Sequence, residues 1–265
     1  MEQRQDIKAQ LAGAGHTPNP ALGQNFLCDE GIISRIMDAA KAEGRLVVEI
    51  GPGLGALTIP LSAQAAQVVA VEKDARLAEG LKARLAGANV TVVAEDFLDT
   101  DLAGRTGGKP WIAVGNLPYY VTTPIVEKLL VNAPESMTLM VQAEAADRFF
   151  AKPGARVYGP VAVMSQYFYR PRRICAVPPC CFYPQPGVDS AVVGLARVDR
   201  PQDPLGFLRF LKRAFAMRRK TLRNNLSPQG GFDAALEALG LPPNVRAEAV
   251  APEALAALYR LETEM

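Results

Sequence analysis

The 265-residue sequence has very little histidine. Its single histidine, His16, lies in a leader rich in glycine and proline. Ser-His-Asp and Cys-His hydrolases need a histidine as general base, and histidine is also the commonest metal ligand. The composition therefore argues against these hydrolases and against histidine-based metal sites, and we expect chemistry without a histidine base.

Cysteine is scarce as well. None of Cys28, Cys175, Cys180 and Cys181 belongs to a C-x-x-C pair, so no zinc or other metal site is expected. We interpret the adjacent pair Cys180 and Cys181 as reduced packing residues rather than as a redox centre.

Long hydrophobic runs are also lacking, and no stretch is long enough to span a membrane. The first ten residues are polar with mixed charge, unlike a secretory signal. These observations predict a cytoplasmic protein. The length suffices for one large domain and a small one, and because nothing in the sequence demands a dimer we expect a monomer.

The first part of the chain alternates short β-branched runs with helical segments. Strands are predicted over residues 46–50, 67–71, 90–94, 111–115 and 138–141, and helices between them include residues 75–85 and 124–130. This alternation predicts an α/β fold with a mostly parallel sheet and helices on both faces. Two further extended runs, residues 167–177 and 190–198, flank a proline-rich loop and suit an antiparallel addition at the sheet edge.

A polar, proline-containing break at residues 199–204 is the predicted domain boundary. It divides the chain into residues 1–199 and 200–265. The second part is predicted to be helical, with helices over residues 205–217, 232–239 and 252–261.

A glycine-rich turn follows the first predicted strand. Glu49 ends that strand, and Gly51 and Gly53 let the backbone turn sharply close to a ligand. In a doubly wound sheet such a turn faces the crevice where nucleotides bind. A plain tight turn is the alternative, and the turn alone does not identify the ligand.

Acidic residues end the next two strands. Glu72 is placed to hold ribose hydroxyls, and Asp96 to accept a hydrogen bond from an adenine amino group; Lys73 and Phe97 follow them and are included in the predicted site. Solvated strand ends are the alternative. The acids suit both NAD and S-adenosylmethionine, but the glycine spacing and the acid before the turn favour the methyl donor.

The run Asn116-Leu117-Pro118-Tyr119 follows the fourth predicted strand. Adenine N6 needs acceptors aimed at its N–H bonds, so that its lone pair points at the methyl group. The Asn116 side-chain oxygen and the Leu117 carbonyl, stiffened by Pro118, are the predicted acceptors. Tyr119 is predicted to stack on an extruded base. A proline-containing turn with an Asx cap is the alternative.

Phe182 lies in the proline-rich loop and is predicted to clamp the base from the opposite side. The alternative is an aromatic residue packed within the loop.

The net charge of +2 hides a local excess of basic residues. Residues 205–226 contain seven Lys or Arg and no acid. The predicted RNA-binding residues are Arg218, Arg219, Lys220 and Arg223, because such a cluster neutralises phosphates. A solvated helix face is the alternative.

From about Gly23 to its end, the chain resembles the ribosomal RNA adenine dimethyltransferases, and within them the bacterial small-subunit enzymes. The resemblance is carried by residues 23–27, 49–58, 116–124, 146–148, 158–159, 182–190 and 218–226. It implies a Rossmann-like class I methyltransferase fold with a mostly parallel seven-stranded sheet and a small α-helical C-terminal domain that binds RNA. It also implies two methyls on each of two adjacent adenosines near the 3′ end of 16S rRNA, within an immature 30S particle, and S-adenosylmethionine as cofactor.

The resemblance adds Gln24, Asn25, Leu27 and Asn116 to the predicted cofactor site, and it implies that residues 24–27 act as a lid over the cofactor. Two departures concern RNA contacts: Ala21 and Leu22 replace frequent basic residues, and Ala143 replaces a common lysine. Tyr120 replaces the asparagine of many members.

Three other functions remain open at this point. They are a resistance-type methyltransferase of large-subunit rRNA, a non-catalytic RNA-binding assembly factor, and a DNA adenine methyltransferase. The intact run at residues 116–119 disfavours the second, and the short region after the boundary disfavours the third.

Overall fold

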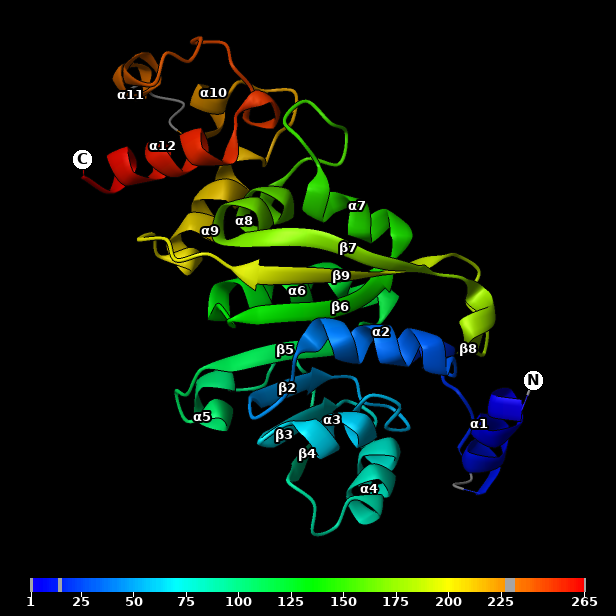
Figure 1. Cartoon of the computed structure of the whole chain (residues 1–265). Coiled ribbons are helices and arrows are strands. Elements are labelled where there is room, and N and C mark those ends of the chain that lie inside the picture. The colour runs from blue at the N-terminus through cyan, green and yellow to red at the C-terminus, as the bar shows by residue number, and fades with distance from the viewer. Residues whose placement is uncertain (1, 14–15, 227–231, 265) are drawn as a thin grey trace. The chain divides into compact units, whose positions relative to one another are not determined.

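The computed structural model describes residues 2–13, 16–226 and 232–264, and it has the α/β architecture predicted from the sequence (Figure 1). The helices are α1 Glu2–Gly13, α2 Glu30–Ala40, α3 Thr58–Gln64, α4 Ala75–Arg84, α5 Leu102–Thr106, α6 Thr122–Asn132, α7 Ala143–Phe150, α8 Pro160–Phe168, α9 Pro204–Ala214, α10 Leu222–Leu226, α11 Asp233–Ala238 and α12 Pro252–Glu264. The strands are β1 Phe26–Leu27, β2 Leu46–Ile50, β3 Gln67–Glu72, β4 Val90–Ala94, β5 Trp111–Asn116, β6 Ser136–Gln142, β7 Tyr169–Val177, β8 Phe182–Tyr183 and β9 Ser190–Arg197.

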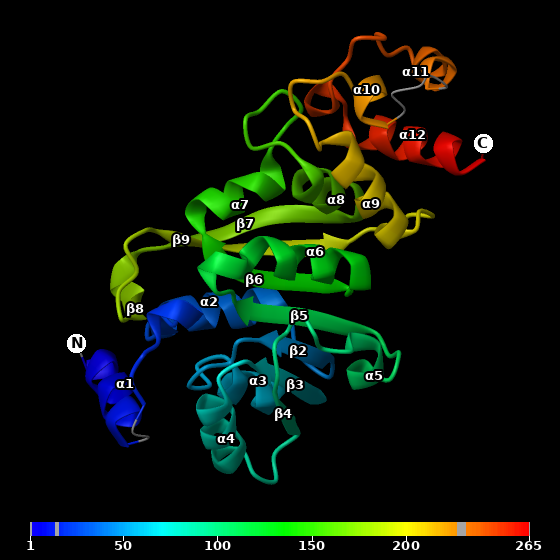
Figure 2. The ribbon, with the colours of Figure 1, turned by 180° about the vertical axis from the view of Figure 1, so that it is seen from behind.

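The main sheet has seven strands in the order β4-β3-β2-β5-β6-β9-β7. Strands β4, β3, β2, β5 and β6 run parallel, and β9 pairs antiparallel with β6. The predicted parallel sheet with an antiparallel addition is therefore confirmed. All five residues of β2 are buried, as expected for a central parallel strand covered on both faces. Helix α2 covers one face and α6 the other (Figures 1 and 2).

Helix α2 illustrates how local sequence sets this layer. Asp29 caps its N-terminus and accepts a hydrogen bond from the Ile32 backbone N–H at 2.9 Å. Ile32, Ile36 and Met37 recur at helical spacing and are buried against the sheet. Our sequence analysis did not predict this helix.

A second, two-stranded sheet joins segments that are far apart in the chain. Strand β1 pairs antiparallel with β8, with Phe26 opposite Tyr183 and Leu27 opposite Phe182. The segment with the predicted lid and the proline-rich loop with the predicted base clamp are thus neighbours.

The chain forms two compact units. The first contains residues 1–129, 134–146 and 172–196, and the second contains residues 130–133, 147–171 and 197–265. Buried contacts tie the earlier segments into the second unit, as where the Tyr158 hydroxyl donates to the Val250 carbonyl at 2.8 Å. The functional division at residues 199 and 200 stays a prediction. No helix in the described ranges is both long and apolar enough to cross a membrane.

Candidate active site

The site lies at the carboxyl ends of the parallel strands. Ile50 at the end of β2 is in register with Gly115 of β5, so the glycine-rich turn and the Asn116 segment leave the sheet side by side. A Cβ added to Gly51 would lie 3.6 Å from the Asn116 carbonyl oxygen. Sheet register therefore brings the predicted cofactor turn and the predicted catalytic run together.

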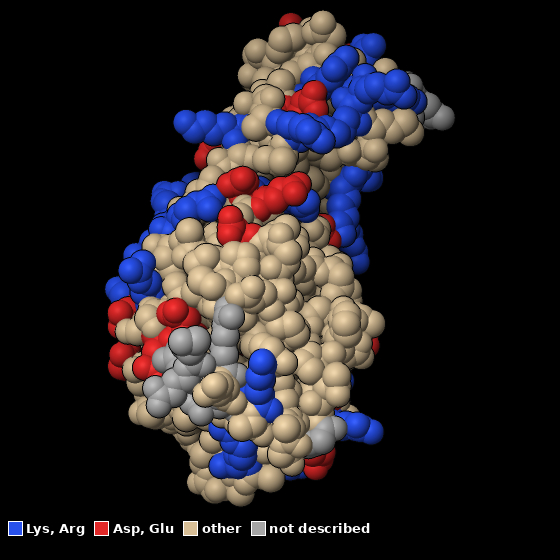
Figure 3. Space-filling model, turned by 90° about the vertical axis from the view of Figure 1, so that its right-hand side faces the viewer, with Lys and Arg blue, Asp and Glu red and all other residues tan. Residues whose placement is uncertain are grey.

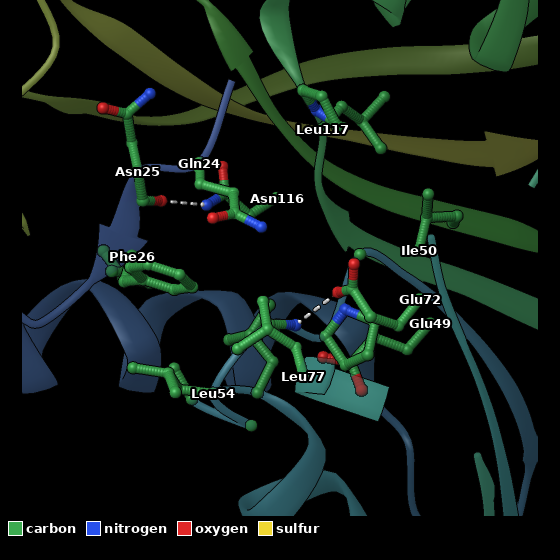
Figure 4. Close-up of a pocket in the computed structure, with 18 of the residues that line it drawn as sticks. Gln24, Asn25, Phe26, Glu49, Ile50, Leu54, Glu72, Leu77, Asn116 and Leu117 are labelled. Carbon is green, nitrogen blue, oxygen red and sulfur yellow. Dashed lines mark hydrogen bonds between the residues drawn. The ribbon is translucent and has the colours of Figure 1, made fainter. Parts of the chain in front are cut away.

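Gly53 has little room for a side chain. Its φ of +56° lies in the left-handed region, and a Cβ there would meet the Phe26 ring at 3.2 Å. Its backbone N–H donates to the Glu72 carboxylate at 2.9 Å (Figure 4). The other Glu72 oxygen accepts from the Asp74 N–H at 2.9 Å. The turn is thus locked to the end of β3.

Two buried carboxylates give the site its electrostatic character. Glu49 is 1% exposed, and its Oε2 has no hydrogen-bond partner among the residues that the structure describes. Burial, with a smaller contribution from the nearby Glu72 carboxylate, raises the pKa of Glu49 to about 8. Burial also raises the pKa of Glu72. An unpartnered buried carboxylate is costly, so this wall of the site suits a cationic ligand group.

Asp96 is held at the end of β4. Its Oδ2 lies 2.8 Å from the Lys73 ammonium nitrogen, and its Oδ1 accepts from the Leu98 N–H at 2.9 Å. The Lys73 ammonium is the main cause that lowers the pKa of Asp96, and that carboxylate in turn raises the pKa of Lys73. Asp96 is therefore ionised at neutral pH.

The predicted lid segment, residues 24–27, is anchored at its first residue. The Gln24 side-chain oxygen accepts from the Asn19 N–H at 2.8 Å, and its amide nitrogen donates to Asp74 at 2.9 Å. His16 Nε2 lies 3.0 Å from the same Gln24 oxygen, so the only histidine serves the lid and is not among the cavity-lining residues. Gln24 thus positions the lid through its own side chain.

Asn116 connects the predicted lid segment to the predicted catalytic run. Its Nδ2 donates to the Asn25 carbonyl oxygen at 3.0 Å (Figure 4). Because the amide nitrogen is committed to that carbonyl, the orientation of the Asn116 amide is fixed. The Leu117 N–H donates to Met140 at 2.9 Å and holds the run against β6.

Tyr119 is partly buried and fixed at its hydroxyl. The Tyr119 hydroxyl oxygen lies 2.7 Å from the hydroxyl oxygen of Ser190. Ser190 is the first residue of β9 and follows Tyr119 by 71 residues in the chain. Burial raises the pKa of Tyr119, so its hydroxyl is neutral at physiological pH. Local sequence gives no signal for this partner, because sheet topology alone brings Ser190 to Tyr119.

One cavity of about 420 Å³ unites these residues, a size suited to a small-molecule ligand. Leu117, Pro118 and Tyr119 line it, together with every residue predicted to bind the cofactor: Gln24, Asn25, Leu27, Glu49, Gly51, Gly53, Glu72, Lys73, Asp96, Phe97 and Asn116.

Phe182 is not brought to this cavity. Its side chain is fully buried in the hydrophobic core with Leu27, Ile36 and Val192, so it cannot clamp a base in this structure. The alternative interpretation, an aromatic residue packed within the loop, describes Phe182 correctly. Pairing of β8 with β1 turns Phe182 to the core face, which the loop sequence could not reveal.

Helix α1 also contributes to the cavity, and our sequence analysis missed it. Ile7 and Gln10 line the cavity, while Ile7 and Leu11 form a small buried cluster with Phe26 and Leu77. The spacing of Ile7 and Leu11, four residues apart, is typical of one helix face and was the available signal.

Acidic residues from other segments lie close to the basic segment, although residues 205–226 themselves contain no acid. In the upper part of the view in Figure 3, Lys and Arg side chains lie together, with acidic side chains among them. Arg218 lies 2.9 Å from Glu248, and Arg223 lies 3.1 Å from Asp233. Arg218 also donates to the Arg156 carbonyl at 2.6 Å. Two of the four predicted RNA-binding residues are therefore engaged within the protein.

The other two predicted RNA-binding residues differ from this pair. Arg219 and Lys220 are exposed and have no ion-pair partner among the described residues. They are the members of the cluster that are available for an external anion.

Comparison with known sequences decides the family. The pattern of the family described as Ribosomal RNA adenine dimethylase matches residues 15–262. The chain belongs to this family. Ribosomal RNA small subunit methyltransferase A of Deinococcus radiodurans is 43% identical over 255 residues, covering 92% of this chain and 85% of the relative. The protein of the same name from Pelotomaculum thermopropionicum is 44% identical and covers 88% of each chain.

Solved structures of this family type share the fold. A dimethyladenosine transferase from Plasmodium falciparum superposes with a TM-score of 0.75 at 24% identity, over 90% of this chain and 98% of that one. The 23S rRNA methyltransferase ErmE gives a TM-score of 0.66 at 29% identity, over 89% and 98%. The predictions of a Rossmann-like class I methyltransferase fold, of methyltransferase activity on ribosomal RNA and of S-adenosylmethionine as cofactor are confirmed.

Proposed function

We propose that this chain transfers two methyl groups to N6 of each of two adjacent adenosines near the 3′ end of small-subunit (16S) rRNA. The observation that carries the proposal is the Asn116 amide, held by the Asn25 carbonyl at the edge of the cofactor cavity. Relatives that are 43% and 44% identical bear the name of a small-subunit rRNA methyltransferase, which supports the choice of RNA.

The chemistry of adenine N6 explains why Asn116 is suitable. The lone pair of this nitrogen is delocalised into the ring, so it reacts only when its N–H bonds are drawn out of the ring plane. With Nδ2 committed to Asn25, the Asn116 Oδ1 serves as one acceptor, and the Leu117 carbonyl serves as the other. No strong base is required, in agreement with a lone histidine that serves the lid.

Tyr119 supplies the surface on which the target base rests. A base methylated at N6 must leave its stack, and an aromatic ring recovers about 1–3 kcal/mol of stacking energy. Because its hydroxyl is held by Ser190, the Tyr119 ring loses little freedom when the base arrives. Phe182 has no part in this proposal.

The cofactor residues fit S-adenosylmethionine, which supplies an electrophilic methyl group on a positively charged sulfur. Glu49, with its unpartnered buried oxygen, balances the positive charge of the methionine part. Glu72 accepts from the ribose hydroxyls through its remaining lone pairs. The ionised Asp96 accepts from the adenine amino group, beside Phe97 in the cavity wall.

We place RNA binding on residues 200–265, with Arg219 and Lys220 as the phosphate contacts. The substrate in this proposal is an immature 30S particle, and the enzyme works on it as a monomer in the cytoplasm. Arg219 and Lys220 are exposed shortly before α10, which supports this assignment.

The test is methyl transfer in vitro from labelled S-adenosylmethionine. We expect label on immature small subunits and little label on naked large-subunit rRNA, with mass spectrometry locating dimethyladenosine at two adjacent positions. The Asn116→Ala variant is expected to lose transfer, and calorimetry with S-adenosylhomocysteine separates this loss from any weakening of cofactor binding. Efficient labelling of large-subunit rRNA alone contradicts the proposal.

A large-subunit target is the second candidate, because ErmE shares the fold at 29% identity. The small-subunit relatives are closer in sequence, at 43–44%. Transfer to a single adenosine of large-subunit rRNA is the result that would favour this candidate.

A further inference from the structure

Tyr120 differs from the other aromatic residues of the cavity. Four aromatic residues line it within the described ranges, and Phe26 and Phe97 are buried while Tyr119 is partly buried. Tyr120 is 52% exposed. An exposed tyrosine at the mouth of a cavity, directly after the catalytic run, has an apolar ring available to a ligand.

The position of this ring is nevertheless defined. A Cβ added to Gly23, whose φ is +61°, would lie 3.3 Å from Tyr120 Cδ1 and 3.7 Å from Pro118 Cβ. One edge of the ring therefore packs on the Gly23 backbone. The short helical turn Tyr119–Val121 is also pinned, because the Thr122 hydroxyl donates to the Pro118 carbonyl at 3.1 Å. The ring is anchored on one side and exposed elsewhere.

We propose that Tyr120 is the stacking surface for the nucleotide next to the adenine being methylated. This inference rests on the proposed function. When the target base leaves its stack, its neighbour loses a stacking partner, and an exposed aromatic ring replaces that partner at little entropic cost. Tyr119 is held by Ser190 within the cavity and serves the target, so Tyr120, one residue further out, serves the neighbour.

The proposal makes Tyr120 a determinant of the two-adenosine substrate. With two adjacent adenosines, the base that waits while its partner is methylated is itself a purine, the class with the largest stacking surface. In this proposal Tyr120 acts on RNA recognition through the exposed part of its ring, and because Tyr120 also lines the cavity, cofactor affinity is measured separately.

The experiment compares Tyr120→Phe, Tyr120→Trp and Tyr120→Leu. Leucine keeps apolar bulk against Gly23 but has no π-face, whereas phenylalanine and tryptophan keep one. For each variant, methyl transfer to immature small subunits gives kcat and KM for the particle, and calorimetry gives the dissociation constant of S-adenosylhomocysteine. Quantification of modified nucleosides gives the yield at each adenosine.

We expect the Phe and Trp variants to stay within about twofold of wild type. The Leu variant should lose about tenfold in kcat/KM for the particle, mainly through KM, because stacking on one base is worth about this factor. Its affinity for S-adenosylhomocysteine should stay within about twofold of wild type.

Two results overturn the inference. Equal activity of the Leu and Phe variants removes the need for a π-face. A loss that follows weaker S-adenosylhomocysteine binding assigns Tyr120 to packing of the lid segment instead. Both results leave wild-type methylation of small subunits intact, so they differ from failure of the proposed function, in which wild type itself labels no small-subunit adenosine.

Discussion

Asn116 donates from its side-chain nitrogen to the backbone carbonyl of Asn25 at 3.0 Å, although 91 residues separate them. The bond joins the predicted lid segment to the run at residues 116–119, which we propose carries the chemistry. Because a backbone carbonyl can only accept, it fixes which end of the Asn116 amide faces the cavity.

The Asn116→Asp variant tests this orientation. A carboxylate cannot donate to the Asn25 carbonyl, so the lid loses its contact and the acceptor loses its fixed direction. We expect transfer to fall by roughly 100-fold or more, as is typical when one preorganised polar group is removed from an active site. Single-turnover kinetics with saturating cofactor measures this. A variant that retains more than a tenth of wild-type transfer contradicts the assigned role.

The buried Glu49 makes stability depend on pH. The pKa of Glu49 is about 8 in the folded protein and 4.5 in the unfolded chain, so folding favours the protonated form of this side chain. Wild-type stability is not reduced by Glu49 ionisation below about pH 4.5, and the free energy of unfolding falls as the pH rises through 8. The Glu49→Gln variant has no group to ionise and does not show this fall. We expect the Tm of the ligand-free variant, relative to wild type, to rise between pH 5 and pH 9, and parallel curves would contradict the assignment.

Lys128 stabilises the loop that carries Asp96 and Phe97. Its ammonium donates to the Leu98 carbonyl at 2.8 Å and the Thr100 carbonyl at 2.7 Å, and it lies 5.6 Å from the centre of the Phe97 ring. We expect Lys128→Met to weaken S-adenosylhomocysteine binding about tenfold, because hydrogen bonds from a charged donor are worth about 1.5–3 kcal/mol.

Calorimetry measures the Lys128 effect, with thermal unfolding to confirm that the variant is folded. Lys82→Met is the matched control, since Lys82 is exposed on α4 and does not line the cavity. A folded Lys128→Met protein with wild-type affinity would show that the loop holds its position without this contact.

The basic residues near α10 are expected to fall into two groups. Removing Arg219 and Lys220 together should weaken binding to the small subunit and lower the slope of log affinity against log salt by about 1.4–1.8. Arg218→Ala should instead lower the Tm, because Arg218 holds Glu248 and the Arg156 carbonyl. Binding titrations at several salt concentrations separate the two. Equal salt slopes for wild type and the double variant would exclude these residues as phosphate contacts.

Much of the cofactor site could be predicted because its determinants are local. The strand that contains Glu49 is otherwise a run of buried β-branched and aliphatic residues, and Glu72 and Asp96 mark the ends of the next two strands. Parallel strands place their carboxyl ends at one edge of the sheet. Once the strands were identified in the sequence, the acids at their ends could be assigned to the same cavity.

The partners of these residues could not be predicted in the same way. Ser190 reaches Tyr119 because β9 returns antiparallel beside β6, and Glu248 neutralises Arg218 across 30 residues. A charge count along the chain cannot register an acid that arrives from another segment. Hydrogen-bond partners are selected by proximity in space, which sequence spacing does not encode.

The sequence by itself determined the α/β fold, and it placed the glycine-rich turn, its acids and the run at residues 116–119 at the ends of strands. Only the tertiary structure decided the orientation of the Asn116 amide and the burial of Phe182. It also decided that Arg219, and not Arg218, is available to bind an external anion. The reason is physical: periodicity and strand-end chemistry act over a few residues. Burial and pairing depend on which distant segments pack together, as β1 and β8 do.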